Sequence, residues 1–233
     1  MSRVIVVGGG IAGLGAAWAL QQAGIDVSVL EAEDEPGGRM RSRQWNGAWI
    51  DLGAEFITSN DEGLRQLAVD VGIDGDRLEY PGQKVGFRIW RDGAPHYLSY
   101  TEPKSFLTFG AMTWRGKTQL LRLLPTLARQ ARRNGGATTE PWRAAAIDDG
   151  ESVETWLSRV APEFLEYVVE PCYELYCGYE PHDFGKAFFV YLSTVYRSTE
   201  IYTFREGLGQ LTRAVAGKLA VTTGAVVSPV TLI

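Results

Sequence analysis

The chain of 233 residues contains only two cysteines and two histidines, which restricts the metal and redox chemistry of its side chains. Cys172 and Cys177 are separated by four residues, and no histidine is close enough in the sequence to complete a zinc site. Two cysteines in an aromatic segment are more typical of buried thiols than of a redox pair. His96 and His182 are far apart and belong to no nucleophile pattern. The sequence therefore predicts no metal site.

The chain also lacks an excess of positive charge and a long uncharged apolar run. Its formal net charge of −5 gives no reason to expect a nucleic acid as partner. Apart from the glycine-interrupted amino terminus, no uncharged apolar stretch reaches the roughly 18 residues of a transmembrane helix. A hydrophobic content of 45% and a charged content of 22% are ordinary for a soluble globular protein. We expect a cytoplasmic location.

Glycine is abundant, and its arrangement near the amino terminus is informative. An apolar strand, residues 4–7, runs into the pattern Gly8-x-Gly10-x-x-Gly13. Gly8 and Gly10 suit a tight turn whose backbone approaches a phosphate, and Gly13 lets the following helix pack closely on the strand. The helix that starts near Gly10 offers free backbone N–H groups and the positive end of its dipole. This arrangement predicts a site for a pyrophosphate.

A second apolar strand, residues 27–30, ends in Glu31, which lies 18 positions after Gly13. A carboxylate there can accept hydrogen bonds from both hydroxyls of an adenosine ribose, and it repels the 2′-phosphate of NADP. The segment Gly37-Gly38-Arg39 follows. The order of strand, glycine loop, helix, strand and acid predicts a dinucleotide site, with NAD as an alternative to FAD because Glu31 permits both.

The pattern along the chain predicts an α/β protein. Residues 1–58 read as strand, helix, strand, loop and strand, the opening of a doubly wound sheet, and a helix over 63–71 ends at Gly72. Short β segments around the turn 91–93 indicate that the chain leaves this domain near residue 79. From Ile201 a strand, a loop, a helix over 210–219 and a strand over 225–233 indicate a return.

We therefore expect a Rossmann-like nucleotide domain, residues 1–78 and 201–233, with an inserted, mainly helical α+β domain over 79–200. Within the insert, residues 115–133 carry six basic residues and no acidic one. An amphipathic helix is predicted there, with Leu120, Leu124, Leu127 and Ala131 on one face. It could rest on an anionic membrane or, as the favoured reading, pack its apolar face into the core. Pro125 should kink this helix or mark its first turn.

Two further segments of the insert are predicted to be structured. Residues 152–169 read as two helices separated at Pro162, with Val153, Trp156, Leu157 and Val160 at core spacing. Residues 172–202 are rich in aromatic side chains, which could line a pocket for a bulky apolar ligand or fill a helical core. Both readings stay open.

Several motifs together resemble the flavin amine oxidase superfamily, which includes monoamine and polyamine oxidases, protoporphyrinogen oxidase and the carotenoid desaturases. The resemblance covers essentially the whole chain, and the motif residues lie mainly between positions 4 and 56. The pair Glu170-Pro171 followed by Gly178-Tyr179 is most similar to the protoporphyrinogen oxidase branch. The principal motifs are the segments 4–14, 29–32, 37–39 and 51–56, with a return segment at 204–211.

The resemblance implies FAD as the cofactor and assigns positions around it. Glu31, followed by Ala32, would hold the ribose, and Arg39, after Gly37 and Gly38, would reach the phosphate or ribitol region. Val227 would contact adenine through its backbone. The pyrophosphate would be cradled by Gly8, Gly10, Ile11, Ala12 and Gly13, and the backbone that passes the flavin would be that of Gly53, Ala54, Glu55 and Phe56.

Members of the superfamily are usually much longer than this chain. The later half of the substrate domain, a Gly-rich segment that embraces the flavin ring and a lysine near the flavin have no counterpart here. Three explanations are open: a second polypeptide completes the flavin site, the chain is a fragment of a longer product, or it is a degenerate relative. We assign no catalytic side chain, because the cofactor motifs have no acid–base pair near them.

The predicted function is that of an FAD-dependent oxidoreductase, or part of one, in which flavin accepts a hydride from a C–N or C–C bond of a small-molecule substrate. Aromatic residues and the amphipathic helix favour a bulky apolar substrate. One alternative is a noncatalytic nucleotide-binding subunit that serves a partner chain. A less favoured alternative is an NAD-dependent dehydrogenase, which would leave the 37–39 and 53–56 segments without a role.

Overall fold

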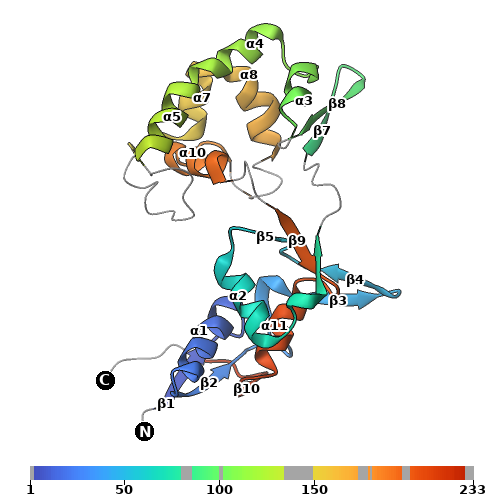
Figure 1. Ribbon diagram of the computed structural model, residues 1–233, viewed down its shortest axis with the longest axis vertical. Coiled ribbons are helices and arrows are strands. Elements are labelled where there is room, and N and C mark those ends of the chain that lie inside the picture. Colours follow the sequence, from blue (N-terminus) through green and yellow to red (C-terminus); the bar gives the residue numbers. More distant parts are fainter. Residues whose placement is uncertain are drawn as a thin grey trace. The chain divides into compact units, whose positions relative to one another are not determined.

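The computed structural model describes residues 3–79, 86–99, 102–133, 149–172, 178, 180–195 and 200–228. The chain divides into two compact units, one made of Met1–Pro81 with Glu200–Ile233 and the other of Gly82–Thr199 (Figure 1). Each unit has hydrophobic clusters of its own. Residues 134–148, Cys177 and part of the aromatic segment lie outside the described residues.

The first unit contains a parallel sheet with the strand order β1-β2-β10. Its strands are β1 (Arg3–Val7), β2 (Asp26–Leu30) and β10 (Val221–Thr222), and α1 (Ile11–Gln22) connects β1 to β2. Buried Ala17, Val27 and Val29 hold the helix on one face of the sheet. Gly24, at φ +77°, ends the helix in the left-handed conformation that glycine adopts without strain. This is the βαβ unit of a Rossmann-like fold.

The end of the first unit differs from the sequence-based prediction. We expected a strand over 225–233, but the strand is β10 at Val221–Thr222 and residues 225–228 form no strand, while residues 229–233 lie outside the described residues. β10 pairs with β2 in parallel, Val221 opposite Val29. The β-branched run after Ala225 misled the prediction because β propensity depends on packing, and Val226 is 80% exposed.

A second, antiparallel sheet of the first unit has the order β5-β9-β6 and joins distant parts of the chain. Two helices pack beside this sheet. A separate two-stranded hairpin turns at Asn46-Gly47, and the positive φ angles of 49° and 82° at these residues suit a tight hairpin turn. The elements are β3 (Ser42–Trp45), β4 (Ala48–Asp51), β5 (Ile57–Thr58), α2 (Glu62–Val71), the turn η2 (Asp74–Asp76), β6 (Arg77–Glu79), β9 (Ile201–Phe204) and α11 (Gly209–Ala216).

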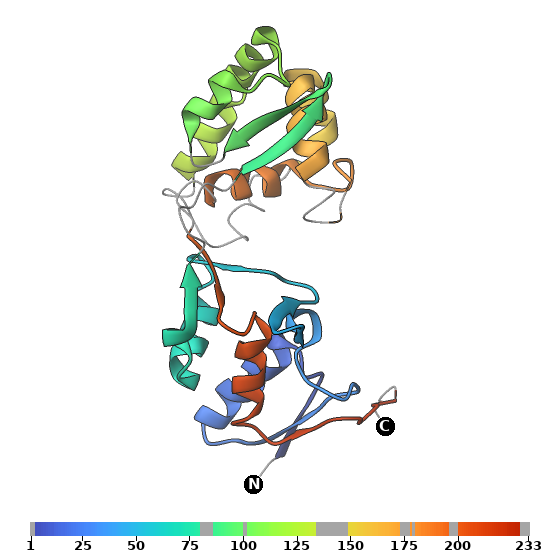
Figure 2. The same ribbon diagram turned by 90° about the vertical axis from the view of Figure 1, so that its right-hand side faces the viewer.

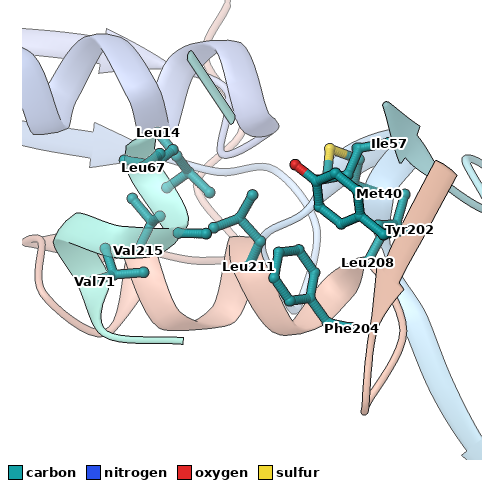
Figure 3. Packing of buried hydrophobic residues seen from close by; sticks show 11 residues of the cluster. Leu14, Met40, Ile57, Leu67, Val71, Tyr202, Phe204, Leu208, Leu211 and Val215 are labelled. Atoms are coloured by element: carbon teal, nitrogen blue, oxygen red, sulfur yellow. The ribbon is translucent and has the colours of Figure 1, made fainter. Parts of the chain in front are cut away.

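The main core of the first unit lies between α1, α2 and α11. Leu14 from α1 and Leu211 and Val215 from α11 are fully buried, and Figure 3 shows them turned toward the side chains of α2. Phe204 and Tyr202 extend the same cluster along β9. The beginning and the end of the chain therefore share one core, which fixes the return segment beside the glycine loop.

The second unit combines a β-hairpin with short helices, and Figure 2 shows the hairpin lying against them. Asp92 and Gly93 form the predicted turn, with φ angles of 51° and 77°. The elements are β7 (Gly86–Arg91), β8 (Ala94–Ser99), α3 (Pro103–Thr108), α4 (Trp114–Gln119), η3 (Leu120–Arg122), α5 (Leu124–Arg133), α7 (Val153–Val160), α8 (Pro162–Phe164), the π-helical turn η4 (Leu165–Val169) and α10 (Lys186–Val195).

Local sequence explains where these helices begin. The Ser152 hydroxyl accepts a hydrogen bond from Thr155 N–H at 3.2 Å and caps α7. Two helices are separated near Pro162 as predicted, and Pro162 is the first residue of the second, α8. Pro125 lies in the first turn of α5, so the predicted single helix over 115–133 is divided. In the described part of the chain, no helix has the length and apolar character needed to cross a membrane.

Among the side chains that the structure describes, which do not include Ala131, the helical wheel predicted for 115–133 was wrong at one position. Leu120 and Leu127 pack against the core of the second unit, as expected, but the buried residue between them is Leu123. Leu124, which we placed on the same face, is 55% exposed. The break before Pro125, with the 3₁₀ turn η3, rotates the register so that Leu123 takes the inward position.

Candidate functional site

The glycine loop after β1 forms a tight turn against the start of α1. Gly8 has φ +101° and donates its N–H to Leu30 O at 2.8 Å, which holds the loop at the carboxyl end of β2. A Cβ atom on Gly13 would lie 2.0 Å from Gly8 O, so only glycine allows the helix to approach the loop this closely. A Cβ on Gly10 would meet nothing within 4 Å. Open space therefore lies in front of Gly10, at the helix N-terminus.

The first turn of α1 presents unpaired backbone N–H groups toward this open space. Gly10 is the N-cap and contributes no side chain, so no capping oxygen occupies the N–H groups of the first turn. Ile11 and Ala12 follow, and Ala12 is exposed. An anion placed there would accept hydrogen bonds from these N–H groups and would be stabilised by the positive end of the helix dipole.

The Glu31 carboxylate is buried beside the glycine loop. Its Oε2 accepts a hydrogen bond from Gly9 N–H at 2.5 Å, and its Oε1 accepts one from Glu33 N–H at 2.9 Å. A Cβ on Gly9 would lie 2.8 Å from Oε2, so the loop and the carboxylate fit closely. Ala32 follows and is exposed. Each carboxylate oxygen keeps a lone pair for another donor.

Gly37, Gly38 and Arg39 lie directly against the glycine loop. Gly37 donates its N–H to Gly9 O at 2.8 Å, and a Cβ on Gly38 would lie 3.3 Å from the Cα of Gly10. Gly37 and Gly38 have φ angles of 132° and 54°, which favour glycine. The turn η1 (Gly38–Met40) then exposes Arg39. Two motifs separated in the sequence are therefore in contact.

The segment Gly53–Phe56 continues this contact. Ala54 donates its N–H to Arg39 O at 2.9 Å, and a Cβ on Gly53 would lie only 2.3 Å from the same oxygen. Glu55 is exposed and Phe56 is partly buried. Backbone hydrogen bonds thus link the glycine loop to 37–39, and 37–39 to 53–56, in one continuous series.

The segment after β10 is hydrogen-bonded to the backbone of Glu31. Glu31 N–H donates to Thr222 O at 2.9 Å, and Ala225 N–H donates to Glu31 O at 2.8 Å. Val227 follows two residues later and is 36% exposed. The backbone around Glu31 is therefore enclosed on one side by β1 and on the other by this segment.

Sequence reasoning missed the group that ties the return segment to this site. Ser42 Oγ accepts Gly209 N–H at 2.6 Å and donates to Asp51 Oδ1 at 2.5 Å, and the same Oδ1 accepts Leu208 N–H at 2.8 Å. Gly207, at φ +71°, has no room for a side chain against Ser42 and Asp51. The only sequence signal is the spacing of Gly207 and Gly209, which does not identify the partners.

No group of three or more histidine, cysteine, aspartate or glutamate side chains that could hold a metal ion occurs in the described ranges. A surface hollow lined by Val4, Gly24 and Val27 lies at the amino ends of β1 and β2. Ligands of parallel sheets bind at the carboxyl ends of the strands, so this hollow is not the nucleotide site.

Comparison with known proteins adds the family context. The model of the family described as flavin containing amine oxidoreductase matches residues 11–232. Protoporphyrinogen oxidase 2 of Arabidopsis thaliana is 31% identical over 173 residues, which is 72% of this chain and 31% of the relative. Putrescine oxidase of Kocuria rosea is 33% identical over 156 residues, 66% of this chain and 30% of the relative.

Solved structures share the fold. Putrescine oxidase bound to putrescine matches with a TM-score of 0.66 at 21% identity, over 96% of this chain and 51% of that one. Cyclohexylamine oxidase of Brevibacterium oxydans matches with a TM-score of 0.66 at 23% identity, over 93% of this chain and 49% of that one. The chain thus spans about a third of these curated relatives and about half of these solved structures.

Proposed function

The chain belongs to the family of flavin-containing amine oxidoreductases, and we propose that its first unit holds the adenosine and pyrophosphate part of FAD. The predicted family, which is described as flavin-containing, is confirmed by this membership, whereas oxidoreductase activity of this chain itself is part of the proposal. The observation that carries the proposal for this chain is the open space in front of Gly10 at the α1 N-terminus, next to Gly9, which holds the buried Glu31 carboxylate.

The residues around this space fit the cofactor. The pyrophosphate would accept the free N–H groups of Ile11, Ala12 and Gly13, where the helix dipole favours negative charge. The remaining lone pairs of Glu31 would accept the two ribose hydroxyls, and the loop holds its carboxylate in place through Gly9 N–H. Bound FAD would supply the redox chemistry by accepting a hydride from a C–N or C–C bond of the substrate.

Arg39 and the 53–56 segment would serve the rest of the cofactor. Arg39 is exposed next to the glycine loop, so its guanidinium can reach a phosphate oxygen or the ribitol chain. The backbone of Gly53 and Ala54 is held against Arg39 O and would pass the flavin. Val227, two residues beyond the bond to Glu31 O, would face adenine.

We propose that the second unit is an inserted, mainly helical domain on the substrate side, and that the substrate is a small molecule with a bulky apolar part. Phe188 on α10 supports this, because it is 42% exposed although its ring stacks on Tyr191 at 5.9 Å and contacts Phe184 at 5.1 Å. Other aromatic side chains of the unit, such as Trp156 and Phe189, fill its core instead.

We further propose that additional polypeptide completes the flavin site and covers one face of the β1-β2-β10 sheet. Ile5 and Val7 on β1 are 58% and 60% exposed, while Val4 and Val6 on its other face pack toward α1. Both faces of a parallel sheet are normally covered. Among the described residues, β1 also pairs with β2 alone, which leaves its other edge open to a further strand.

The FAD proposal is tested by binding spectroscopy on the full chain. We expect FAD to bind and to show the shifted visible bands of a protein-bound flavin. Glu31→Gln should weaken FAD binding about tenfold or more, because hydrogen bonds to a charged group contribute about 1.5–3 kcal/mol. Riboflavin, which has no adenosine ribose, provides the matched control and should bind both forms alike. No flavin bands, even with added partner polypeptide, would refute the proposal.

The alternative functions give different results in the same preparation. Binding of NAD in place of FAD would favour a dehydrogenase. A noncatalytic nucleotide-binding subunit would hold FAD but oxidise nothing, alone or with its partner. Copurification followed by intact-mass measurement separates the remaining cases, since turnover by a lone 25.7 kDa monomer would exclude a purely noncatalytic role.

A further inference from the structure

Arg41, the residue after η1, lies against the glycine loop but belongs to none of the motifs assigned to the cofactor. A Cβ on Gly37 would lie 2.7 Å from Arg41 Cγ, so the stem of the arginine covers one face of Gly37. Gly37 in turn donates its N–H to Gly9 O at 2.8 Å. Only Gly37 therefore separates the stem of Arg41 from the loop proposed to hold the pyrophosphate.

The guanidinium of Arg41 lies beside Glu33. Its Nη1 is 3.9 Å from Glu33 Oε2, and the Arg41 side chain is 27% exposed. The backbone N–H of Glu33 donates to Glu31 Oε1 at 2.9 Å, so Glu33 is hydrogen-bonded to the carboxylate that we assign to the ribose. Arg41 thus connects the 37–39 turn to the 31–33 turn, on the adenosine side of the proposed site.

Folding stability does not account for an arginine at this position. Arg41 Nε is buried and has no hydrogen-bond partner in the part of the chain that the structure describes. A buried donor without an acceptor destabilises the folded chain, and a partly exposed ion pair such as Arg41–Glu33 contributes little stability in return. An apolar side chain of similar length, such as methionine, would avoid the unpaired donor. The positive charge of Arg41 therefore needs another explanation.

The charges around the proposed site supply that explanation. Four of the five residues from Glu31 to Glu35 are acidic, and the pyrophosphate of FAD would add further negative charge near them. Like charges close together raise the free energy of the bound state. The backbone of Glu33 is fixed here, because its N–H is bonded to Glu31 and its O accepts Gly224 N–H at 2.9 Å. A cation beside the Glu33 carboxylate therefore reduces the repulsion of an anionic cofactor.

We propose that Arg41 is a positioning residue for FAD that acts through Glu33, an inference that rests on the cofactor site proposed above. Its guanidinium offsets the charge of Glu33, while Glu31 keeps the charge that accepts the ribose hydroxyls. Arg39 differs from Arg41 in this respect, because it is exposed and is assigned a direct contact with the cofactor.

Isothermal titration of the full chain with FAD and with ADP, at low ionic strength, tests the proposal. ADP carries the adenosine and the pyrophosphate without the flavin, so it reports on this half of the site alone. We expect Arg41→Met to weaken the binding of both ligands about fivefold, and this loss to shrink at high salt, which screens charges. Arg41→Lys keeps the positive charge and should bind both ligands nearly as tightly as the unmodified chain.

Two further variants separate an action through Glu33 from a general loss of charge. Adding Glu33→Gln to Arg41→Met should restore binding, because the carboxylate left without its partner is removed. Arg43 is the matched control, since it pairs with Glu35 at 3.6 Å on β3, where its side chain is 60% exposed. Arg43→Met should change the affinity for FAD and ADP less than about twofold. Without ligand, Arg41→Met should unfold at the same temperature as the unmodified chain or a higher one, because the unpaired Nε is gone.

The outcomes distinguish the role of Arg41 from the cofactor site itself. If the unmodified chain binds neither FAD nor ADP, the proposed cofactor site is overturned, and the role of Arg41 with it. If the unmodified chain binds both ligands and Arg41→Met binds them equally well, the site stands and the role of Arg41 is refuted. That role is also refuted if Arg41→Met unfolds at a clearly lower temperature, or if adding Glu33→Gln restores no affinity, because Arg41 would then act through packing alone.

Discussion

The hydroxyl of Ser42 accepts the backbone N–H of Gly209 at 2.6 Å, across 167 positions of sequence. This buried bond attaches the start of α11 to the β3–β4 hairpin, next to the segments 37–39 and 53–56. Asp51 strengthens it by accepting both the Ser42 hydroxyl and Leu208 N–H. The return segment is thereby held beside the site proposed for FAD.

Ser42→Ala should lower the free energy of unfolding by about 1–3 kcal/mol, because the buried Gly209 N–H then has no acceptor. Ser152→Ala, which removes an exposed cap from α7, serves as comparison and should cost about 1 kcal/mol or less. Urea unfolding followed by circular dichroism measures both. An equal or smaller loss at Ser42 would show that the Ser42–Gly209 bond does not anchor α11.

Two glycines of α1 should respond in opposite directions to the same change. Gly13→Ala would place Cβ 2.0 Å from Gly8 O, so the loop must shift, and we expect FAD binding to be lost and the unit to be destabilised. Gly15→Ala meets nothing within 4 Å and should stabilise the helix by about 0.5–1 kcal/mol. Flavin titration and thermal unfolding test the pair, and normal FAD binding by Gly13→Ala would contradict the close approach of loop and helix.

Lys186 of α10 should give the second unit a stability that depends on pH. Its Nζ donates to Glu151 at 2.6 Å and also to Asp149, and these hydrogen bonds hold the pKa of both carboxyls below their ordinary values of 4.5 and 3.8. A lowered folded pKa means that this stabilisation is complete above the ordinary values and is lost as the pH falls through the lowered ones.

Lys186→Met should therefore cost about 1–2 kcal/mol at neutral pH, and the difference from the unmodified chain should shrink below about pH 4. Lys218→Met, at an exposed position, is the control and should change stability by less than about 0.5 kcal/mol. Urea midpoints measured across this pH range give the comparison. If the difference in the free energy of unfolding between the variant and the unmodified chain is the same at all pH values, the ion pairs are not its source.

Tyr202→Phe should raise stability by about 1 kcal/mol, since the buried Tyr202 hydroxyl has no hydrogen-bond partner in the described part of the chain. Burial also raises the pKa of this phenol above its ordinary 10.0, so the unmodified chain should lose stability as the pH rises past 10. The phenylalanine variant lacks that loss. Thermal unfolding at neutral and alkaline pH tests both expectations. A phenylalanine variant less stable than the unmodified chain at neutral pH would show that the hydroxyl has a hydrogen-bond partner.

Much of the glycine-loop architecture could be predicted because its causes are local. The turn at Gly8 and the close approach at Gly13 each require a residue without a side chain. Both can be inferred from the sequence because glycine is the only such residue. Glu31 at the end of β2 follows from strand periodicity, and Gly72 and Gly24 mark helix ends for the same conformational reason. The roles of these residues toward FAD remain predictions that the binding experiments address.

Other features could not be predicted because they depend on segments that meet only in three dimensions. The position of β10 is set by its pairing with β2, not by the β-branched residues that follow it. The inward side of η3 and α5 is set by the break before Pro125, which exposes Leu124. The sequence marks the break through Pro125 but not the direction in which it turns the leucines, and nothing in it marks the pairing of β10 with β2.

By itself, the sequence determined the dinucleotide-binding motif and the family, because glycine conformation, strand polarity and a terminal carboxylate act within a few residues. Only the tertiary structure decided that Ser42 and Asp51 hold Gly209, and that Leu123 rather than Leu124 faces the core of the second unit. These partners are set by hydrogen bonds and packing between segments that are distant in the sequence. Such contacts form, and contribute to stability, only when the chain has folded.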